Sequence, residues 1–152
     1  MKRGKILNKK LNTAIADMGH GEIIVVCDAG MKIPSEAQRI DLALTEGVPT
    51  VEEVLELLTE EFCYERVIVT EDLPIFNEPL YEKVEMICKE CEIEKVSYKW
   101  FMDNIPAKAK YIVRTGSFSP YGDIALVSGI EVPKWFNKEG VKVPPVYENR
   151  MS

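Results

Sequence analysis

Segments with apolar side chains at helical spacing alternate along the chain with short, nearly continuous apolar runs. Residues 8–18 carry Leu11, Ile15 and Met18 on one side of a helical period, which is typical of an amphipathic helix. Residues 22–27 are apolar at nearly every position, as expected of a strand that is covered on both faces. This alternation predicts a mainly parallel sheet with helices on its faces.

The same pattern continues to about residue 130. The expected strands are 22–27, 40–44, 67–70, 93–98, 111–114 and 124–128, and the expected helices are 8–18, 50–61, 77–91 and 99–104. Thr50 and Glu53 have the spacing of a capping box, which fixes the start of the second helix. The predicted fold class is therefore α/β, in three layers (α/β/α), with a mainly parallel sheet of about six strands flanked by helices.

The pattern changes after Ile130. Pro133, Gly140, Pro144 and Pro145 interrupt the segment, and its apolar side chains are scattered. We therefore predict one α/β domain at 1–132 and an extended C-terminal arm at 133–152. Because apolar side chains are unfavourable in contact with water, we expect the arm to pack on its own domain or on a neighbouring subunit.

Length and charge narrow the function classes. A chain of 152 residues buries a core as a single domain. Its net charge of −6 argues against nucleic acid and against an anionic membrane surface as partners. No apolar run approaches the roughly 18 to 20 residues of a membrane span, and the basic start leads into a polar segment, unlike a signal peptide. By elimination we expect a cytoplasmic protein.

Two of the four cysteines, Cys88 and Cys91, have the C-x-x-C spacing of redox motifs and half zinc sites. They fall at the end of an expected helix among glutamates, where the pKa of a thiol is raised, whereas redox motifs occupy helix N-termini. Cys27 and Cys63 are isolated in apolar runs, so no second pair completes a zinc site. We predict neither a metal nor a redox role.

The only histidine, His20, lies between Gly19 and Gly21, shortly before the strand that ends at Asp28. Histidine is the one side chain whose unperturbed pKa falls in the physiological range, so this placement suggests acid–base chemistry. The alternative is a histidine that satisfies terminal helix carbonyls, with a flanking glycine as the cap. These residues alone leave both interpretations open.

Polar side chains follow the expected strands. They are Asp28, Glu71, Asp72, Tyr98, Lys99 and the stretch 114–123. Ligands of open α/β sheets bind beyond the carboxyl ends of the strands, and this mixture of acids, bases and hydroxyls suits a small polyhydroxylated molecule. Any one of these residues could instead simply form a turn.

Several other classes lack their motifs. The sequence has no G-x-x-x-x-G-K-[ST] loop, no G-x-G-x-x-G after the first strand and no G-x-S-x-G elbow. A single histidine excludes paired-histidine metal sites. A phospho-acceptor receiver domain stays open, although Asp28 stands alone where such domains carry a second acidic cluster for magnesium.

Three groups of motifs occur in a specific order. They are Met18–Gly21 with Val25–Gly30, Arg39–Leu44 with Gly47–Pro49, and Arg114–Gly116 with Ser119–Gly122. Together, from about residue 1 to 132, the sequence resembles the D-ribose pyranase and L-fucose mutarotase family, and its N-terminal half is nearer to the ribose branch. The resemblance implies that family's fold and a metal-free, non-redox sugar isomerase. It also implies a ring-stacked homo-oligomer, a decamer in the ribose enzymes, with sites between subunits.

By position, the resemblance makes His20 the catalytic histidine, Asp28 a sugar-binding carboxylate, and Tyr121, Gly122 and Asp123 a sugar-contacting stretch. There are two departures from the family. Lys99 stands where ribose pyranases usually have a second histidine and the fucose branch often has arginine. Asp123 replaces the usual asparagine, which removes a hydrogen-bond donor and adds negative charge near Asp28.

The resulting hypothesis is an isomerase that interconverts the cyclic forms of a free aldose, with D-ribose as the expected substrate. His20 would shuttle a proton between ring oxygen and anomeric hydroxyl, while Asp28 orients a sugar hydroxyl or the imidazole. Lys99, Tyr121 and Asp123 would hold the remaining hydroxyls. No cofactor is expected, because no bond outside the hemiacetal changes. The alternatives are an L-fucose-type mutarotase and a non-catalytic sugar-binding or regulatory protein.

Overall fold

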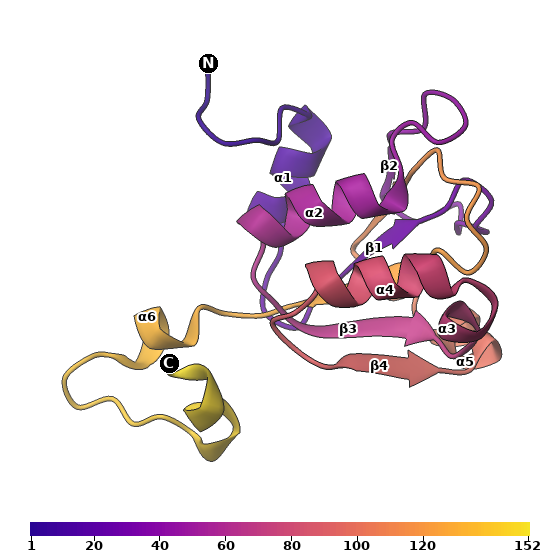
Figure 1. Cartoon of the computed structure of the whole chain (residues 1–152). Helices are drawn as coiled ribbons and strands as arrows, with labels where there is room; N and C mark the ends of the chain where they lie inside the picture. Colours follow the sequence, from indigo (N-terminus) through magenta and orange to yellow (C-terminus); the bar gives the residue numbers. More distant parts are fainter.

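The computed structural model describes residues 1–152, which form a six-stranded sheet in the order β2-β5-β1-β6-β3-β4 (Figure 1). The strands are β1 (Ile23–Cys27), β2 (Arg39–Asp41), β3 (Tyr64–Thr70), β4 (Ile93–Val96), β5 (Tyr111–Arg114) and β6 (Ile124–Ser128). Strand β6 is antiparallel to both of its neighbours, β1 and β3, whereas every other adjacent pair is parallel. The predicted α/β class with a mainly parallel sheet is confirmed.

Helices cover both faces of the sheet. They are α1 (Lys9–Asp17), α2 (Val51–Glu61), α3 (Asp72–Phe76), α4 (Glu78–Ile87) and α5 (Tyr98–Asn104). Helices α1, α2 and α4 contribute to the larger buried cluster on one face, and α5 contributes to a smaller one on the other. No helix in the structure combines the length and the apolar character that crossing a bilayer requires.

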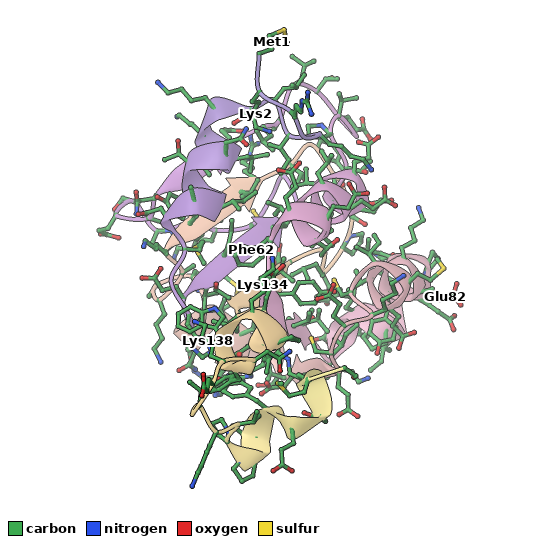
Figure 2. The ribbon with its side chains drawn as sticks, turned by 90° about the vertical axis from the view of Figure 1, so that its left-hand side faces the viewer. Met1, Lys2, Phe62, Glu82, Lys134 and Lys138 are labelled. Atoms are coloured by element: carbon green, nitrogen blue, oxygen red, sulfur yellow. The ribbon has the colours of Figure 1, made fainter.

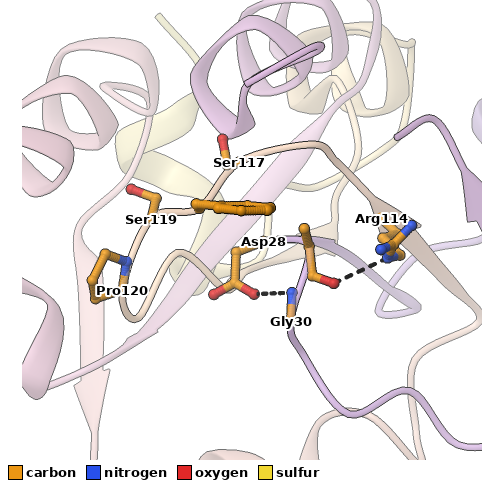
Figure 3. A pocket seen from close by; sticks show the side chains of 8 residues that line it. Asp28, Gly30, Arg114, Ser117, Ser119 and Pro120 are labelled. Carbon is orange, nitrogen blue, oxygen red and sulfur yellow. Dashed lines mark hydrogen bonds between the residues drawn. The ribbon is translucent and has the colours of Figure 1, made fainter. Parts of the chain in front are cut away.

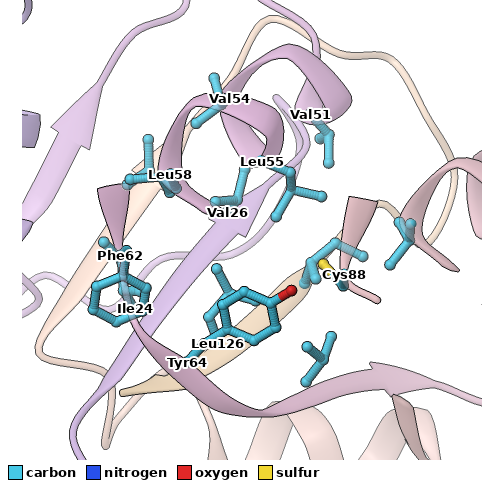
Figure 4. Close-up of a cluster of buried hydrophobic side chains, with 14 of the residues drawn as sticks. Ile24, Val26, Val51, Val54, Leu55, Leu58, Phe62, Tyr64, Cys88 and Leu126 are labelled. Carbon is cyan, nitrogen blue, oxygen red and sulfur yellow. The ribbon is translucent and has the colours of Figure 1, made fainter. Parts of the chain in front are cut away.

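The two clusters follow from the alternation of side chains along the strands. Ile24 and Val26 of β1 belong to the larger cluster, where they pack with Leu55 of α2 (Figure 4). Val25 and Cys27, at the intervening positions, belong to the smaller cluster. All four strand residues are fully buried, and burial of each of the three aliphatic side chains contributes about 2 kcal/mol to folding. Strand β1 is therefore a rigid central element between the loops at its two ends.

The predicted helix starts are present as hydrogen bonds. The Asn8 side chain accepts a bond from the backbone N–H of Leu11 and caps α1. At α2, Thr50 and Glu53 exchange both bonds of a capping box. At α5 the Ser97 side chain accepts a single capping bond from the N–H of Trp100.

Some boundaries differ from the sequence-based expectation. Strand β2 ends at Asp41 because residues 42–49 form a turn that packs on Gly116, where an added Cβ would lie 2.3 Å from the carbonyl oxygen of Thr45. Strand β3 begins earlier, at Tyr64, because β6 supplies hydrogen-bond partners there. Helix α4 ends at Ile87, and the short helix α3 occupies the connection that follows β3.

The C-terminal arm is less extended than the sequence suggests. It contains α6 (Val132–Phe136) and a 3-10 helix, η1 (Pro145–Arg150). Proline is favourable in the first turn of a helix, so Pro133 and Pro145 begin these helices and do not merely interrupt the chain. Figure 1 shows the arm beyond the end of the sheet at which β3 and β4 begin, and Figure 2 looks onto that end, with Lys134 and Lys138 marking the arm.

Candidate functional site

Two acidic residues meet at the end of the sheet where the parallel strands finish. Asp28 directly follows β1 and Asp123 directly precedes β6, and these strands are antiparallel neighbours with Val26 opposite Ile124. The backbone N–H of Asp28 donates to Oδ1 of Asp123 at 3.3 Å. Sheet topology thus brings together two predicted site residues that are far apart in sequence.

A pocket of about 460 Å³ opens beside Asp28 (Figure 3). Its lining residues are Asp28, Ala29, Gly30, Arg114, Ser117, Phe118, Ser119 and Pro120. One Asp28 carboxylate oxygen accepts a 2.7 Å bond from the N–H of Gly30. Arg114 donates to the carbonyl of Ala29 at 3.1 Å and pairs with Asp41, so the pocket wall is held by fixed hydrogen bonds. Its volume and polarity suit a monosaccharide.

Burial changes the chemistry of Asp123, which is only 5% exposed. Desolvation raises the pKa of its carboxyl to about 7, with a further contribution from the negative charge of Asp28. At neutral pH a large share of the molecules therefore carry a proton on Asp123. A protonated carboxyl donates a hydrogen bond, so it regains the donor that an asparagine at this position would supply.

The two residues before Asp123 are held in a constrained loop. Tyr121 has a φ of 56°, in the left-handed region, and its ring lies against Phe76 (5.7 Å between centroids) and Tyr98 (6.1 Å). An added Cβ on Gly122 would lie 2.8 Å from the carbonyl oxygen of Ser119. The stretch that follows the pocket wall is therefore fixed by packing.

Lys99 lies at the same end of the sheet, in the first turn of α5, but its side chain points elsewhere. It pairs with Asp103 one turn along the helix and is 86% exposed. Within one copy of the chain it makes no hydrogen bond to Asp28, Tyr121 or Asp123.

His20 lies at the opposite end of the sheet, before β1. Helix α1 ends at Asp17 with Met18 as its cap, and the imidazole makes no bond to a helix carbonyl, so the capping alternative is not supported. The backbone turns at Gly21, whose φ is +82° and whose N–H donates to the carbonyl of Ser128 at 2.8 Å. This turn leaves the His20 side chain 42% exposed at the edge of the molecule.

The acidic neighbour of His20 is Glu65, which sequence reasoning missed. Both Glu65 oxygens lie 2.9 Å from Nε2 of His20, and one of them also pairs with Arg150 at 3.2 Å. The sequence signal for Glu65 was weak: an acidic residue two positions before the apolar run Val67–Val69. The partnership depends on the strand order, because β6 lies between β1 and β3.

The predicted site residues thus form two groups. The Asp28 half-site comprises Asp28, Tyr121, Gly122, Asp123 and the adjoining pocket, and the His20 half-site comprises His20 and Glu65. Strand β1 lies between them and spans roughly 17 Å. One sugar cannot contact both half-sites of a single copy.

The cysteines take no part in either half-site. Burial raises the pKa of Cys88 to about 12, so its thiol is unreactive at neutral pH, and the pKa of Cys91 is also raised by burial. All four cysteines are free, and no group of three or more histidine, cysteine, aspartate or glutamate side chains is arranged to hold a metal ion.

Comparison with known proteins shows the family to which the chain belongs. The profile of the RbsD / FucU transport protein family matches residues 1–131. The chain belongs to this family.

Family members with curated names resemble the chain along its whole length. It is 42% identical to "D-ribose pyranase 2" of Rubrobacter xylanophilus over 150 residues, which cover 99% of this chain and 97% of that protein. It is 38% identical to "D-ribose pyranase 1" of Streptomyces griseus over 151 residues, which cover 99% of this chain and 100% of that protein. Both matches extend beyond the family profile and include most of the C-terminal arm.

Solved structures of the family share the fold. The structure of Bacillus subtilis RbsD complexed with D-ribose matches with a TM-score of 0.81 and 35% identity, covering 86% of this chain and 98% of that one. A fucose mutarotase of Streptococcus pneumoniae complexed with L-fucose matches with a TM-score of 0.70 and 21% identity, over 82% and 94% of the two chains, which shows the fold alone.

Proposed function

We propose that the protein is a D-ribose pyranase, an isomerase that interconverts the pyranose and furanose forms of free D-ribose. Similarity to curated D-ribose pyranases, at 42% and 38% identity over 99% of the chain, carries this proposal. The 460 Å³ pocket at the Asp28 half-site, whose lining includes Asp28, Arg114 and two serines, supports it, in a fold shared with a ribose-complexed relative. The protein would bind the free monosaccharide and require no cofactor or metal, because only the hemiacetal is made and broken.

The chemistry requires two proton movements. A proton leaves the anomeric hydroxyl while the ring oxygen receives one, the bond from C1 to the ring oxygen breaks, and C1 becomes a carbonyl. Attack on C1 by a different hydroxyl then closes the other ring size. His20 would carry the proton, as the only histidine of the chain. Asp28, Tyr121, Gly122 and Asp123 would hold the sugar, with Lys99 as a further cation at this end of the sheet.

A complete site would need two subunits, because one copy separates the half-sites. We place the His20 half-site of one subunit against the Asp28 half-site of a neighbour. The rim around the Asp28 half-site supports such a contact: Leu44, Ile75, Phe76 and Phe118 are all at least 65% exposed and gather at this end of the sheet. A ring-type homo-oligomer, such as a decamer, would repeat this contact in a closed assembly. We further propose a cytoplasmic protein without a nucleic-acid or membrane partner.

Saturation-transfer NMR on free sugars tests the activity directly. Addition of the protein is expected to accelerate exchange between pyranose and furanose signals of D-ribose more than exchange in L-fucose or other aldoses. Preferential acceleration of fucose anomer exchange would instead indicate a mutarotase. Thermal stabilisation by ribose without faster exchange would indicate a non-catalytic sugar-binding protein.

A further inference from the structure

The C-terminal arm folds back onto the only histidine of the chain. Helix η1 places the hydroxyl of Tyr147 3.4 Å from Nε2 of His20 and the guanidinium of Arg150 3.2 Å from Glu65. Arg150 also donates to the carbonyl of Ile130 at 3.3 Å, which ties the end of the arm to the residues just before it. The Tyr147 ring packs on Phe136 of α6, with centroids 5.7 Å apart. The arm therefore carries two polar groups to the His20 half-site.

The position of Glu65 is built into the sheet. The pairing of β3 with β6 shifts register between Tyr64 and Arg66, and such a bulge re-aims the residue it contains. Opposite it, Gly129 allows a close approach, since an added Cβ would lie 2.9 Å from the Cβ of Glu65. The Glu65 side chain is only 19% exposed, in contrast to the half-exposed imidazole. Glu65 is thus a fixed partner for a ring that faces solvent.

This geometry selects one tautomer of the neutral imidazole. A carboxylate only accepts hydrogen bonds, so both Glu65 oxygens at 2.9 Å favour a proton on Nε2. Nδ1 then carries the free lone pair, and it has no hydrogen-bond partner within the chain. The Arg150 guanidinium limits the rotation of the Glu65 side chain, because it binds one of the same carboxylate oxygens.

We propose that the arm acts as a positioning device for the proton carrier, in which Arg150 and Tyr147 lock Glu65 and His20 so that Nδ1 faces the sugar. The role of these contacts in positioning a proton carrier rests on the proposed isomerase activity, whereas the contacts themselves do not. Glu65, Arg150 and Tyr147 are positioning residues, because they act through His20 and need not touch the substrate. The same contacts could merely fasten the arm, so the test needs a readout that fastening alone would not change.

The single histidine makes that readout simple, because every imidazole ¹⁵N signal belongs to His20. At a pH where the ring is neutral, the unaltered protein is expected to show the proton on Nε2. Glu65→Gln should produce a mixture of the two tautomers, since an amide both donates and accepts. Lys134→Gln is the matched control, because Lys134 lies in the arm but pairs with Glu131 and not with the His20 half-site.

The exchange rate supplies the second readout. At saturating ribose, Glu65→Gln is expected to lower the exchange rate roughly 10- to 100-fold with little change in ribose affinity, as when a group that orients an imidazole is removed. Arg150→Gln and Tyr147→Phe should lower the exchange rate less than Glu65→Gln does. Arg150→Lys should keep most of the exchange rate that Arg150→Gln loses, and Lys134→Gln should leave the rate unchanged. Tyr147→Phe keeps the ring that packs on Phe136, so arm folding is preserved.

Three results would overturn the proposal. They are a proton on Nδ1 in the unaltered protein, an unchanged tautomer in Glu65→Gln, or a full exchange rate in both Arg150→Gln and Tyr147→Phe. If the unaltered protein does not accelerate ribose exchange at all, the proposed function fails. The ¹⁵N spectra of the unaltered protein and Glu65→Gln would still decide whether Glu65 fixes the ring, and the spectrum of Arg150→Gln, expected to show more of the second tautomer, would decide whether the arm does.

Discussion

Replacing His20 by alanine is expected to reduce the catalysed exchange between ribopyranose and ribofuranose by roughly 10²- to 10⁴-fold, the usual contribution of a positioned acid–base group. The chain has no second histidine to take over the proton. The loss should appear in saturation-transfer NMR at saturating ribose. Ribose should still raise the melting temperature, because the Asp28 half-site remains intact.

His20→Gln provides the matched comparison, because glutamine keeps a polar side chain beside Glu65 but cannot carry a proton near neutral pH. It should be as inactive as His20→Ala. Arg66→Gln, which breaks only the exposed pair between Arg66 and Glu94, should retain full activity. Wild-type exchange rates in His20→Ala would remove the histidine from the mechanism.

Asp123→Asn is expected to stabilise the protein at pH 8 and to flatten its pH dependence between about pH 4 and pH 7. The pKa of Asp123 is raised from 3.8 to about 7 in the folded protein, so the folded state binds the proton more tightly than the unfolded chain. Its contribution to stability is full below pH 3.8 and is lost as the pH rises to about 7. That shift corresponds to about 4 kcal/mol as an order of magnitude. Asparagine does not titrate, so Asp123→Asn removes this decrease of the free energy of unfolding with rising pH.

Urea unfolding at pH 5 and pH 8 measures the effect as a change in the free energy of unfolding. Asp103→Asn is the matched control, because it removes one aspartate that is exposed on α5. It should leave the slope between the two pH values unchanged. An Asp123→Asn protein that loses as much stability from pH 5 to pH 8 as the unaltered protein would show that the buried carboxyl is already ionised.

The sheet could be predicted from the sequence because each buried strand is a short, continuous apolar run, such as the one ending at Cys27. The place of Asp28 at the ligand-binding edge follows from a general rule, since ligands bind where parallel strands end. Its meeting with Asp123 depends in addition on β6 running antiparallel beside β1. The pairing of His20 with Glu65 could not be predicted, because it depends on β6 lying between β1 and β3. No local pattern records that order of strands.

The arm shows a different difficulty. Its prolines indicated an interrupted, extended chain, whereas Pro133 and Pro145 each occupy the first turn of a short helix. The contacts of Tyr147 and Arg150 with the His20 half-site join residues more than eighty positions apart in sequence. Such contacts arise from tertiary packing and leave no spacing in the sequence that could reveal them.

A ribose site shared by two subunits is tested most directly by mixing two inactive variants. His20→Ala and Asp28→Ala are unfolded together, refolded as mixed oligomers and compared with each variant refolded alone. If each site takes His20 from one subunit and Asp28 from its neighbour, random 1:1 mixing leaves roughly a quarter of the sites with both residues intact. Exchange at about that fraction of the unaltered rate is therefore expected. Mixed oligomers no more active than the separate variants would contradict a site built from two copies of the chain.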